Sequence, residues 1–272
     1  MSIHGVAQTG LADVLGDRRW LVLTGAGVST DSGIPDYRGG HAPVRTPMTI
    51  ARFRSGHEAQ QRYWARSYLG WSSMGTARPN ATHHLLAELE GRGRLSGLIT
   101  QNVDGLHTAA GHRDLVELHG AIDRVVCLDC HATSSRTTLQ HRLTALNRAF
   151  DATGAALLPD GDVDLDATAG FVVAACESCG GALKPDVVFF GENVPLGRVA
   201  QCTALVESAE ALVVLGSSLH VFSGRRFVKQ AHARGIPIVI VNRGATRGDE
   251  LATVKVDAGC AETLTELSRL TA

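Results

Sequence analysis

Five short, mostly apolar runs recur along this chain of 272 residues, and stretches with helical patterns separate them. The runs are Trp20–Leu23, Gly97–Thr100, Arg124–Cys127, Ala211–Leu215 and Ile236–Val241. Several are continuous rather than alternating, as expected for parallel strands that are buried on both faces. Helical patterns between them, such as Thr82–Gly91 and Arg198–Ala209, complete an α/β alternation. The sequence therefore predicts a doubly wound parallel sheet. Pro79-Asn80 offers a turn before the first of these helices, and Thr82 is a candidate N-cap.

Residues 137–171 break this alternation. A helical pattern at Leu139–Phe150 leads into the acidic segment Leu157–Asp166, which we expect to be an exposed loop. Two CxxC pairs surround the region, and such paired thiolates are typical of a closed, structural zinc site. The alternatives are two chance pairs or a redox pair. The predicted ligands are Cys127, Cys130, Cys176 and Cys179. The sequence thus predicts a small inserted zinc-ribbon and helical module.

A glycine-rich loop directly follows the first apolar run. Small residues at Gly25, Ala26 and Gly27 let backbone N–H groups approach a pyrophosphate. A tight strand-to-helix turn is the plain alternative. Thr30 replaces the third glycine of the dehydrogenase fingerprint, which disfavours hydride transfer. The continuation, residues 31–38, is too polar and too rich in turn residues to be simply the next helix, and this favours a ligand-binding loop.

Polar side chains follow the second apolar run at Gln101, Asn102 and Asp104. Open α/β sheets place ligands beyond the carboxyl ends of their strands, where amides and a carboxylate can hold ribose hydroxyls and a carboxamide. His119, in the string ELHG, is a candidate general base because the pKa of imidazole lies near neutrality. The chain has 12 histidines, so taken alone His119 would more often be structural.

The strings GAGVSTDSGIPDYR, TQNVDGLH and ELHG, in this order, resemble the sirtuins, the NAD-dependent protein deacylases. The resemblance covers roughly Leu11 to Leu267. The strings TPMT, GWSS, CLDC, LLPDGDV and LKPDVVFFGE are similar to class II members, which also carry an insertion between the cysteine pairs. The family fold implies a Rossmann-like NAD-binding domain of segments 11–45, 76–125 and 182–272. It further implies a helical cofactor and substrate-loop segment, 46–75, and a small zinc-binding domain, 126–181.

The resemblance implies NAD and zinc as cofactors. It makes His119 the general base, Asn102 the residue that positions ribose hydroxyls and a water, and Asp104 the partner of the nicotinamide carboxamide. Ile34 would line the nicotinamide pocket. The other implied NAD contacts are Gly25, Ala26, Gly27, Ser29, Thr30, Asp36, Tyr37, Arg38, Gln101, Val103, Gly216, Ser217, Ser218, Asn242, Arg243, Gly244 and Cys260.

Two further sets of residues are implied for the substrate. Val188, Phe189 and Gly191 would pair an acyl-lysine peptide by strand addition, whereas an ordinary buried strand is the alternative. Tyr63 and Arg66 are three apart in a helical pattern and resemble the pair with which desuccinylating sirtuins hold an acidic acyl chain. An aromatic core residue beside a solvated arginine is the other interpretation, and both stay open.

The implied activity is transfer of the acyl group of acyl-lysine to ADP-ribose, releasing nicotinamide and O-acyl-ADP-ribose. Mono-ADP-ribosyl transfer to protein and a non-catalytic zinc-ribbon or NAD-binding module are the alternatives. The expected partners are acyl-lysine proteins or peptides. A net charge of −1 and a pI near 6.9 give no reason to expect nucleic acid or a membrane surface as a partner. No signal sequence or long apolar segment is evident, and six cysteines, four of them in CxxC pairs, favour a reducing, cytoplasmic location. The sequence makes no prediction of the oligomeric state.

Overall fold

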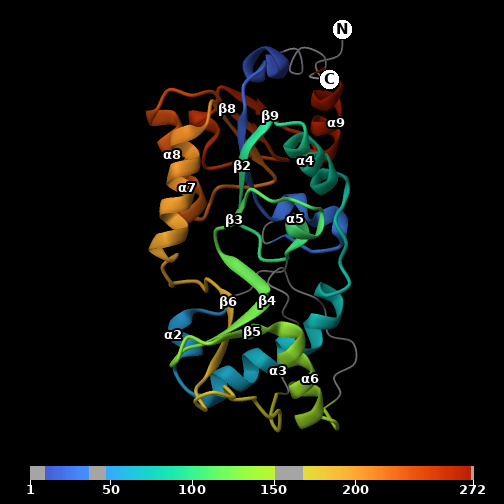
Figure 1. The fold of residues 1–272 in the computed structure, drawn as a ribbon, viewed down its shortest axis with the longest axis vertical. Helices are drawn as coiled ribbons and strands as arrows, with labels where there is room; N and C mark the ends of the chain where they lie inside the picture. The colour runs from blue at the N-terminus through green and yellow to red at the C-terminus, as the bar shows by residue number, and fades with distance from the viewer. Residues whose placement is uncertain (1–9, 37–46, 151–167, 271–272) are drawn as a thin grey trace.

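The structure is a computed structural model of the chain and describes residues 10–36, 47–150 and 168–270. A large parallel sheet with its helices lies at one end of the molecule, the upper end in Figure 1. A smaller antiparallel sheet lies at the other end, accompanied by the helices α2 (Ile50–Phe53), α3 (His57–Met74) and α6 (Arg136–Leu146).

The large sheet has the strand order β3-β2-β1-β7-β8-β9, and every neighbouring pair is parallel. Its strands are β1 (Trp20–Thr24), β2 (Leu95–Thr100), β3 (Leu115–Glu117), β7 (Ala211–Leu215), β8 (Ile238–Val241) and β9 (Val254–Val256). Taken in chain order, these six strands are arranged 3-2-1-4-5-6, which is the order of dinucleotide-binding sheets. The prediction of a Rossmann-like, doubly wound sheet is confirmed. The topological switch point lies between β1 and β7.

Successive residues of β1 point to opposite faces of the sheet, and helices cover both faces. The helices are α4 (Ala81–Gly91) and α9 (Cys260–Leu270) on one face, and α7 (Leu196–Ser208) and α8 (Phe222–Ala233) on the other. Leu21 and Leu23 belong to the core beneath α7 and α8, whereas Trp20 and Val22 belong to the core beneath α4 and α9. Figure 1 shows the two helix pairs on opposite sides of the sheet. Burial on both faces explains why the strand sequences are continuous apolar runs. Cys202 is fully buried in α7, as the apolar pattern around it indicates.

The smaller sheet has the order β5-β4-β6 and is antiparallel. Its strands are β4 (Gly120–Cys127), β5 (Thr133–Ser135) and β6 (Leu183–Val187). The predicted run Arg124–Cys127 is a strand, but it belongs to this sheet and not to the parallel one, because Val126 pairs with Lys184. The helix predicted at Leu139–Phe150 begins and ends earlier. The predicted loop Leu157–Asp166 lies outside the described residues.

The N-cap of α4 differs from the prediction. Asn80, not Thr82, caps the helix, and its side chain accepts a 2.9 Å hydrogen bond from the Thr82 N–H. The His83 side chain contacts the Asn80 N–H in return, which completes a capping box. Asn is among the best N-caps, and here it also donates to the Val28 carbonyl at 2.8 Å. The start of α4 is thereby attached to the loop that follows β1.

Further short elements of the described chain are a helical segment over residues 10–15 and the turns η1 (Ala26–Val28), η2 (Thr30–Ser32), α5 (Leu106–Ala109) and η3 (Asp249–Leu251). Among the described residues, no helix combines the length and the apolar character needed to cross a bilayer.

Candidate functional site

The glycine loop after β1 lies against the end of β7, at the switch point of the sheet. Gly25 N–H donates to the Leu215 carbonyl at 3.1 Å, and Gly27 N–H donates to the Gly216 carbonyl at 2.8 Å. A Cβ on Gly27 would lie 2.9 Å from Gly216 Cα, and Gly216 itself has φ of +58°. Side chains are therefore excluded at this crossing. The bare backbone forms a cradle of the kind that a pyrophosphate requires, so these residues fit NAD.

Side chains from the two loops after β1 and β2 form one polar cluster. Ser29 Oγ donates to Asp104 Oδ2 at 2.7 Å, and Asn102 Nδ2 donates to Ser29 Oγ and to the Gly25 carbonyl, each at 3.1 Å. Asp104 Oδ1 accepts the Leu106 N–H at 2.9 Å. Burial raises the pKa of the Asp104 carboxyl, while these hydrogen bonds act in the opposite direction. The cluster places an amide, a hydroxyl and a carboxyl together at the carboxyl ends of β1 and β2.

An apolar wall adjoins this cluster. Ile34, Leu106 and Ile122 are buried together with Met74, and Val103 packs against them. The Val103 carbonyl accepts the Ile122 N–H at 2.9 Å, which fixes the residue next to Asp104. A flat aromatic amide would find an apolar surface and a polar anchor side by side here.

Gln101 joins the ends of β1, β2 and β7. Its Nε2 donates to Ser217 Oγ at 2.8 Å and to the Thr24 carbonyl at 3.2 Å. Gly224, near the start of α8, is so close that a Cβ there would overlap the Gln101 side-chain oxygen. Gln101 is thus held between the strand ends and α8.

His119 follows β3 and faces the same edge. Its Nδ1 lies 2.8 Å from the Gln101 carbonyl, and its Nε2 lies 2.7 Å from Ser223 Oγ. Because a carbonyl only accepts, Nδ1 carries the hydrogen and Nε2 of the neutral ring is the acceptor. Burial, and secondarily the charge of Arg198, lowers the pKa of His119, while the bond to the Gln101 carbonyl raises it. A neutral imidazole whose Nε2 carries a lone pair is the form that a general base needs.

The predicted contacts from the second half of the chain lie at the ends of the parallel strands. Gly216, Ser217 and Ser218 follow β7, and Asn242, Arg243 and Gly244 follow β8. The Lys255 ammonium donates to the Asn242 carbonyl at 2.7 Å, and Gly244 N–H donates to Asp257 Oδ1 at 3.0 Å. Cys260 is buried at the start of α9.

Of the first-half contacts, Ala26 lies in η1, Thr30 lies in η2, and Asp36 ends the described segment. Tyr37 and Arg38 lie outside the described residues. The described members of the predicted set therefore gather at one edge of the sheet.

The predicted substrate segment begins where β6 ends. Val188 N–H donates to the His119 carbonyl at 2.8 Å, so the segment adjoins the candidate base. Phe189 N–H donates to Glu192 Oε2 at 2.9 Å, and Glu192 pairs with the buried Lys184 ammonium at 3.1 Å. Gly191 has φ of +77°, which permits the tight turn that brings Glu192 back to Phe189.

Tyr63 packs beside this segment and Arg66 lies one helical turn further along α3. The Tyr63 ring contacts the rings of Phe53, Trp64 and Phe189, with centroids 5.2–5.5 Å apart, and the residue is only 4% exposed. Arg66 is half-buried. Tyr63 thus borders the predicted substrate segment from within an aromatic cluster.

The four predicted metal ligands meet in the small unit. Their Sγ atoms lie within 4.8 Å of one another, and the Cys127–Cys179 and Cys130–Cys176 pairs are 3.5 and 3.7 Å apart. Tetrahedral zinc with Zn–S bonds of about 2.3 Å requires sulfur atoms about 3.8 Å apart. The cluster therefore fits a closed zinc site.

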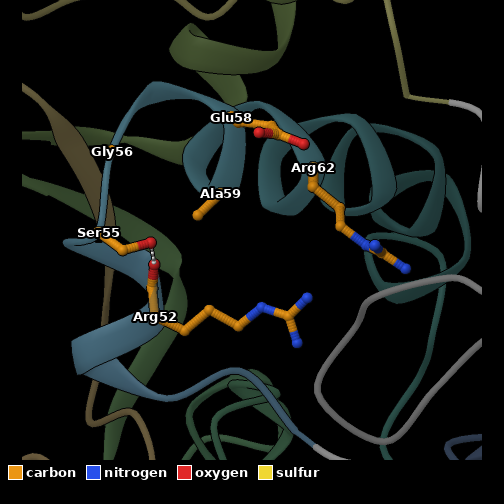
Figure 2. Close-up of a pocket in the computed structure, with 6 residues that line it drawn as sticks. All are labelled: Arg52, Ser55, Gly56, Glu58, Ala59 and Arg62. Atoms are coloured by element: carbon orange, nitrogen blue, oxygen red, sulfur yellow. Dashed lines mark hydrogen bonds between the residues drawn. The ribbon is translucent and has the colours of Figure 1, made fainter.

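Two cavities lie near α2. One of about 250 Å³ is at the turn between α2 and α3, and Figure 2 shows the Arg52 and Arg62 side chains at its edge. Its six lining residues are not among the predicted site residues: Arg52, Ser55, Gly56, Glu58, Ala59 and Arg62. The other, of about 260 Å³, adjoins the substrate segment and is lined in part by Val188, Lys184 and Arg198.

Comparison with known proteins identifies the family. The model of the Sir2 family matches residues 25–223, which is most of the chain and spans the glycine loop, the polar cluster and His119. The chain belongs to the Sir2 family. The family prediction made from the three sequence strings is confirmed.

Relatives of this Sir2 protein match along nearly all of its length. NAD-dependent protein deacetylase 1 of Mycobacterium avium (strain 104) is 52% identical over 273 residues, covering 98% of this chain and 97% of the relative. NAD-dependent protein deacetylase 1 of Streptomyces coelicolor is 56% identical over 250 residues, covering 90% and 84%. A solved structure of Sir2 with a p53 peptide and NAD+ has a TM-score of 0.78 and 29% identity, covering 96% of this chain and 97% of the other. Membership of class II stays a prediction.

Two residues at the site were not singled out from the sequence. Ser223 contacts His119 Nε2, and Arg198 lies near enough to lower the pKa of His119. The sequence signal for Ser223 was weak: it follows Gly216-Ser217-Ser218 by a few residues and so belongs to the same sheet edge. Arg198 occupies an ordinary position in a helical pattern.

Proposed function

We propose that this protein is an NAD-dependent protein-lysine deacylase, which transfers the acyl group of acyl-lysine to ADP-ribose and releases nicotinamide and O-acyl-ADP-ribose. One observation carries the proposal: His119 presents an acceptor Nε2 at the sheet edge where the glycine cradle and the Ser29–Asn102–Asp104 cluster meet. Relatives about 50% identical along most of the chain are named NAD-dependent protein deacetylases, which supports the same activity here.

In this proposal the two loops after β1 and β2 bind the nicotinamide end of NAD. Asp104 accepts a hydrogen bond from the carboxamide, and Asn102 orients ribose hydroxyls and a water. Ile34 and Val103 exclude bulk water from the nicotinamide, which strengthens the polar contacts around it. When bound, NAD supplies the leaving nicotinamide and the ADP-ribose that accepts the acyl group.

His119 takes the proton of a ribose hydroxyl. Its bond from Nδ1 to the Gln101 carbonyl holds the ring so that Nε2 faces the cofactor site. The lowered pKa keeps the ring neutral at physiological pH, so a base is available before the acyl group moves. No nucleophilic side chain is required, because ADP-ribose itself captures the acyl group.

The segment Val188–Gly191 holds the peptide. An extended acyl-lysine peptide would add to it as a strand, with Val188, Phe189 and Gly191 as the pairing residues. Since the His119 carbonyl accepts the Val188 N–H, the same segment fixes the distance between the peptide and the base. We further propose that acyl-lysine proteins in the cytoplasm are the substrates, without nucleic acid or a membrane as a partner.

Incubation with NAD and a panel of acyl-lysine peptides tests the proposal, with mass spectrometry of both the nucleotide and the peptide products. Deacylated peptide, nicotinamide and O-acyl-ADP-ribose in equal amounts are expected. ADP-ribose attached to protein would instead indicate a mono-ADP-ribosyltransferase, and NAD binding without turnover would indicate a binding module.

Substitution of the base provides the internal control. His119→Ala should bind NAD and remain folded, yet lose at least about a hundredfold in turnover, the low end for general-base removal. His141→Ala, at an exposed position on α6, is the matched control and should behave as the wild type. Wild-type turnover in His119→Ala would contradict the assigned role.

A further inference from the structure

Ser223 is the side chain that meets the acceptor nitrogen of His119. It is the second residue of α8 and is half-buried, and its Oγ lies 2.7 Å from His119 Nε2. The contact joins parts of the chain 104 residues apart. A distance of this size is typical of a short, well-formed hydrogen bond.

The direction of this hydrogen bond follows from the other side of the ring. Nδ1 faces a carbonyl and carries the hydrogen, so in the neutral ring Nε2 has only a lone pair to offer. The Ser223 hydroxyl therefore donates to Nε2. After the ring gains a proton, Nε2–H donates instead, and the same hydroxyl oxygen accepts. A hydroxyl can make both bonds by rotation, which an amide N–H or a carbonyl cannot do.

We propose that Ser223 is a positioning residue for the acyl-transfer reaction, fixing the orientation of the His119 ring before the reaction and stabilising the imidazolium once the ribose proton has been transferred. The inference rests on the proposed deacylase function and adds a residue to the same site. In the step itself the Ser223 hydroxyl first rotates, so that its hydrogen leaves the single lone pair of Nε2. The ribose O–H bond then breaks, its proton forms the Nε2–H bond, and the Ser223 oxygen accepts from Nε2–H. That proton is later returned to the lysine amine that departs, so Ser223 gains and loses nothing.

The surrounding contacts fix Ser223 in place. Gly224, the next residue, lies against the Gln101 side chain with no space for a Cβ, and Gln101 Nε2 is bonded to Ser217 Oγ. The Gln101 carbonyl is also the partner of His119 Nδ1. Gln101 thus contacts both the His119 ring, through its carbonyl, and α8, through its side chain. Because Ser223 belongs to α8, the partners of the two ring nitrogens are fixed relative to each other. Further along α8, Phe227 and Val228 are fully buried in the sheet core, which prevents the helix from shifting.

The charges around His119 disfavour its protonated form, so a second hydrogen-bond partner for the ring affects how readily it accepts a proton. Arg198 of α7 faces the ring and opposes its positive form, although Asp186 of β6 accepts two 2.9 Å hydrogen bonds from Arg198 and offsets part of that charge. Burial opposes the imidazolium as well. The Gln101 carbonyl favours it, and in this proposal the Ser223 hydroxyl, 2.7 Å from Nε2, favours it as well. A hydrogen bond to the charged ring is stronger than one to the neutral ring, so the hydroxyl raises the pKa of His119 relative to an alanine at this position.

The experiment compares Ser223→Ala with Ser223→Thr in the full-length chain. Ser223→Ala should lower kcat about tenfold, the effect of one hydrogen bond, while KM for NAD and for an acetyl-lysine peptide stays within about twofold. The acid limb of the kcat/KM profile should move to lower pH by about 0.5–1 unit. Ser223→Thr keeps the hydroxyl and should restore both kcat and the profile. Ser208→Ala, which removes an exposed hydroxyl at the end of α7, is the matched control.

A measurement without NAD separates geometry from turnover. In protein labelled with ¹⁵N-histidine, the Nε2 resonance of His119 should move in Ser223→Ala toward that of an imidazole acceptor without a donor. It should keep its wild-type position in Ser223→Thr and Ser208→Ala. The His119→Ala variant identifies the resonance.

The outcomes distinguish this inference from the proposed function. Full turnover in His119→Ala would overturn the general-base role, and the positioning role with it. Loss of turnover in His119→Ala together with wild-type kcat, pH profile and Nε2 resonance in Ser223→Ala would overturn the Ser223 inference alone. So would a Ser223→Thr variant as slow as Ser223→Ala, because the defect would then come from packing, or a change confined to KM.

Discussion

Ser29 and Asp104 lie 75 residues apart in the chain, yet Ser29 Oγ donates a 2.7 Å hydrogen bond to Asp104 Oδ2. The bond closes the gap between the loop after β1 and the loop after β2. Asn102 shares the same hydroxyl at 3.1 Å, so the glycine cradle and the polar cluster act as one unit. A change at Asp104 should therefore affect the binding of NAD before it affects the binding of peptide.

The first prediction concerns Asp104→Asn. Removing the carboxylate should raise KM for NAD about tenfold, the value of one hydrogen bond to a charged group, and leave KM for the peptide unchanged. Steady-state kinetics with each substrate varied in turn measures both values. Asp114→Asn, at an exposed position before β3, is the control. An equal rise in both KM values would mean that Asp104 supports the fold of the site as a whole.

The second prediction concerns the zinc ligands. Cys179→Ser should lower both the zinc content and the soluble yield, because a structural zinc contributes directly to folding. Elemental analysis should find one zinc per chain in the wild type. Cys202→Ala removes a thiol that is fully buried in α7 and should keep the full zinc content, even though its stability falls. Full zinc content in Cys179→Ser would contradict the ligand assignment.

The sequence predicted which segments form buried strands and helices better than it predicted which strand or residue each one contacts. Trp20–Leu23 and Ala211–Leu215 are strands of the parallel sheet, because continuous apolar runs require two covered faces. Arg124–Cys127 has the same local pattern but joins the antiparallel sheet, since apolarity specifies burial and not the neighbouring strand. Asn80 caps α4 because it also reaches the Val28 carbonyl, a contact between segments that periodicity does not encode.

The same distinction applies to the site. Gln101, Asn102, Asp104 and His119 stood out because polar residues at a strand end have a recognisable place in α/β proteins. Ser223 did not, since its contact with His119 depends on how α8 packs against the end of β2. Long-range packing of this kind becomes evident only in three dimensions.

Three buried histidines form a separate cluster behind the site, and this is the basis of the third prediction. His83, His107 and His112 are at most 6% exposed, and the His107 ring lies 4.7 and 5.2 Å from the other two. His107 Nε2 is 3.0 Å from Thr24 Oγ1, and His112 Nδ1 is 3.3 Å from a Glu90 oxygen. Burial lowers the pKa of all three, that of His83 to about 4.

The sign of the pH dependence follows from these shifts. An unfolded chain takes up protons at these rings near pH 6.5, whereas the folded protein resists protonation of His83 until about pH 4. The free energy of unfolding should therefore be constant above pH 6.5 and fall as the pH decreases from 6.5 toward 4. His83 alone contributes up to about 3 kcal/mol to that loss. Urea unfolding between pH 8 and pH 4.5 measures it.

Substitution within the cluster provides the control for this prediction. His83→Gln should lower stability at every pH, because the capping box of α4 is changed, but it should also flatten the slope below pH 6.5. His141→Gln, at an exposed position, should keep the wild-type slope. An unchanged slope in His83→Gln would mean that other groups cause the acid sensitivity.

The last prediction concerns the acyl group and rests on Tyr63 and Arg66. If the pair holds an acidic acyl chain, the guanidinium must reach the carboxylate beside the Phe189 ring, which lies 5.2 Å from the Tyr63 ring. Succinyl- or glutaryl-lysine peptides should then be deacylated faster than acetyl-lysine peptides. Arg66→Met should abolish that preference and spare acetyl removal, whereas Arg62→Met on the same helix should not. The measurement is kcat/KM for each peptide of the acyl panel. If the wild type prefers acetyl or long uncharged acyl groups, Tyr63 is instead a residue of the aromatic core formed with Phe53 and Trp64.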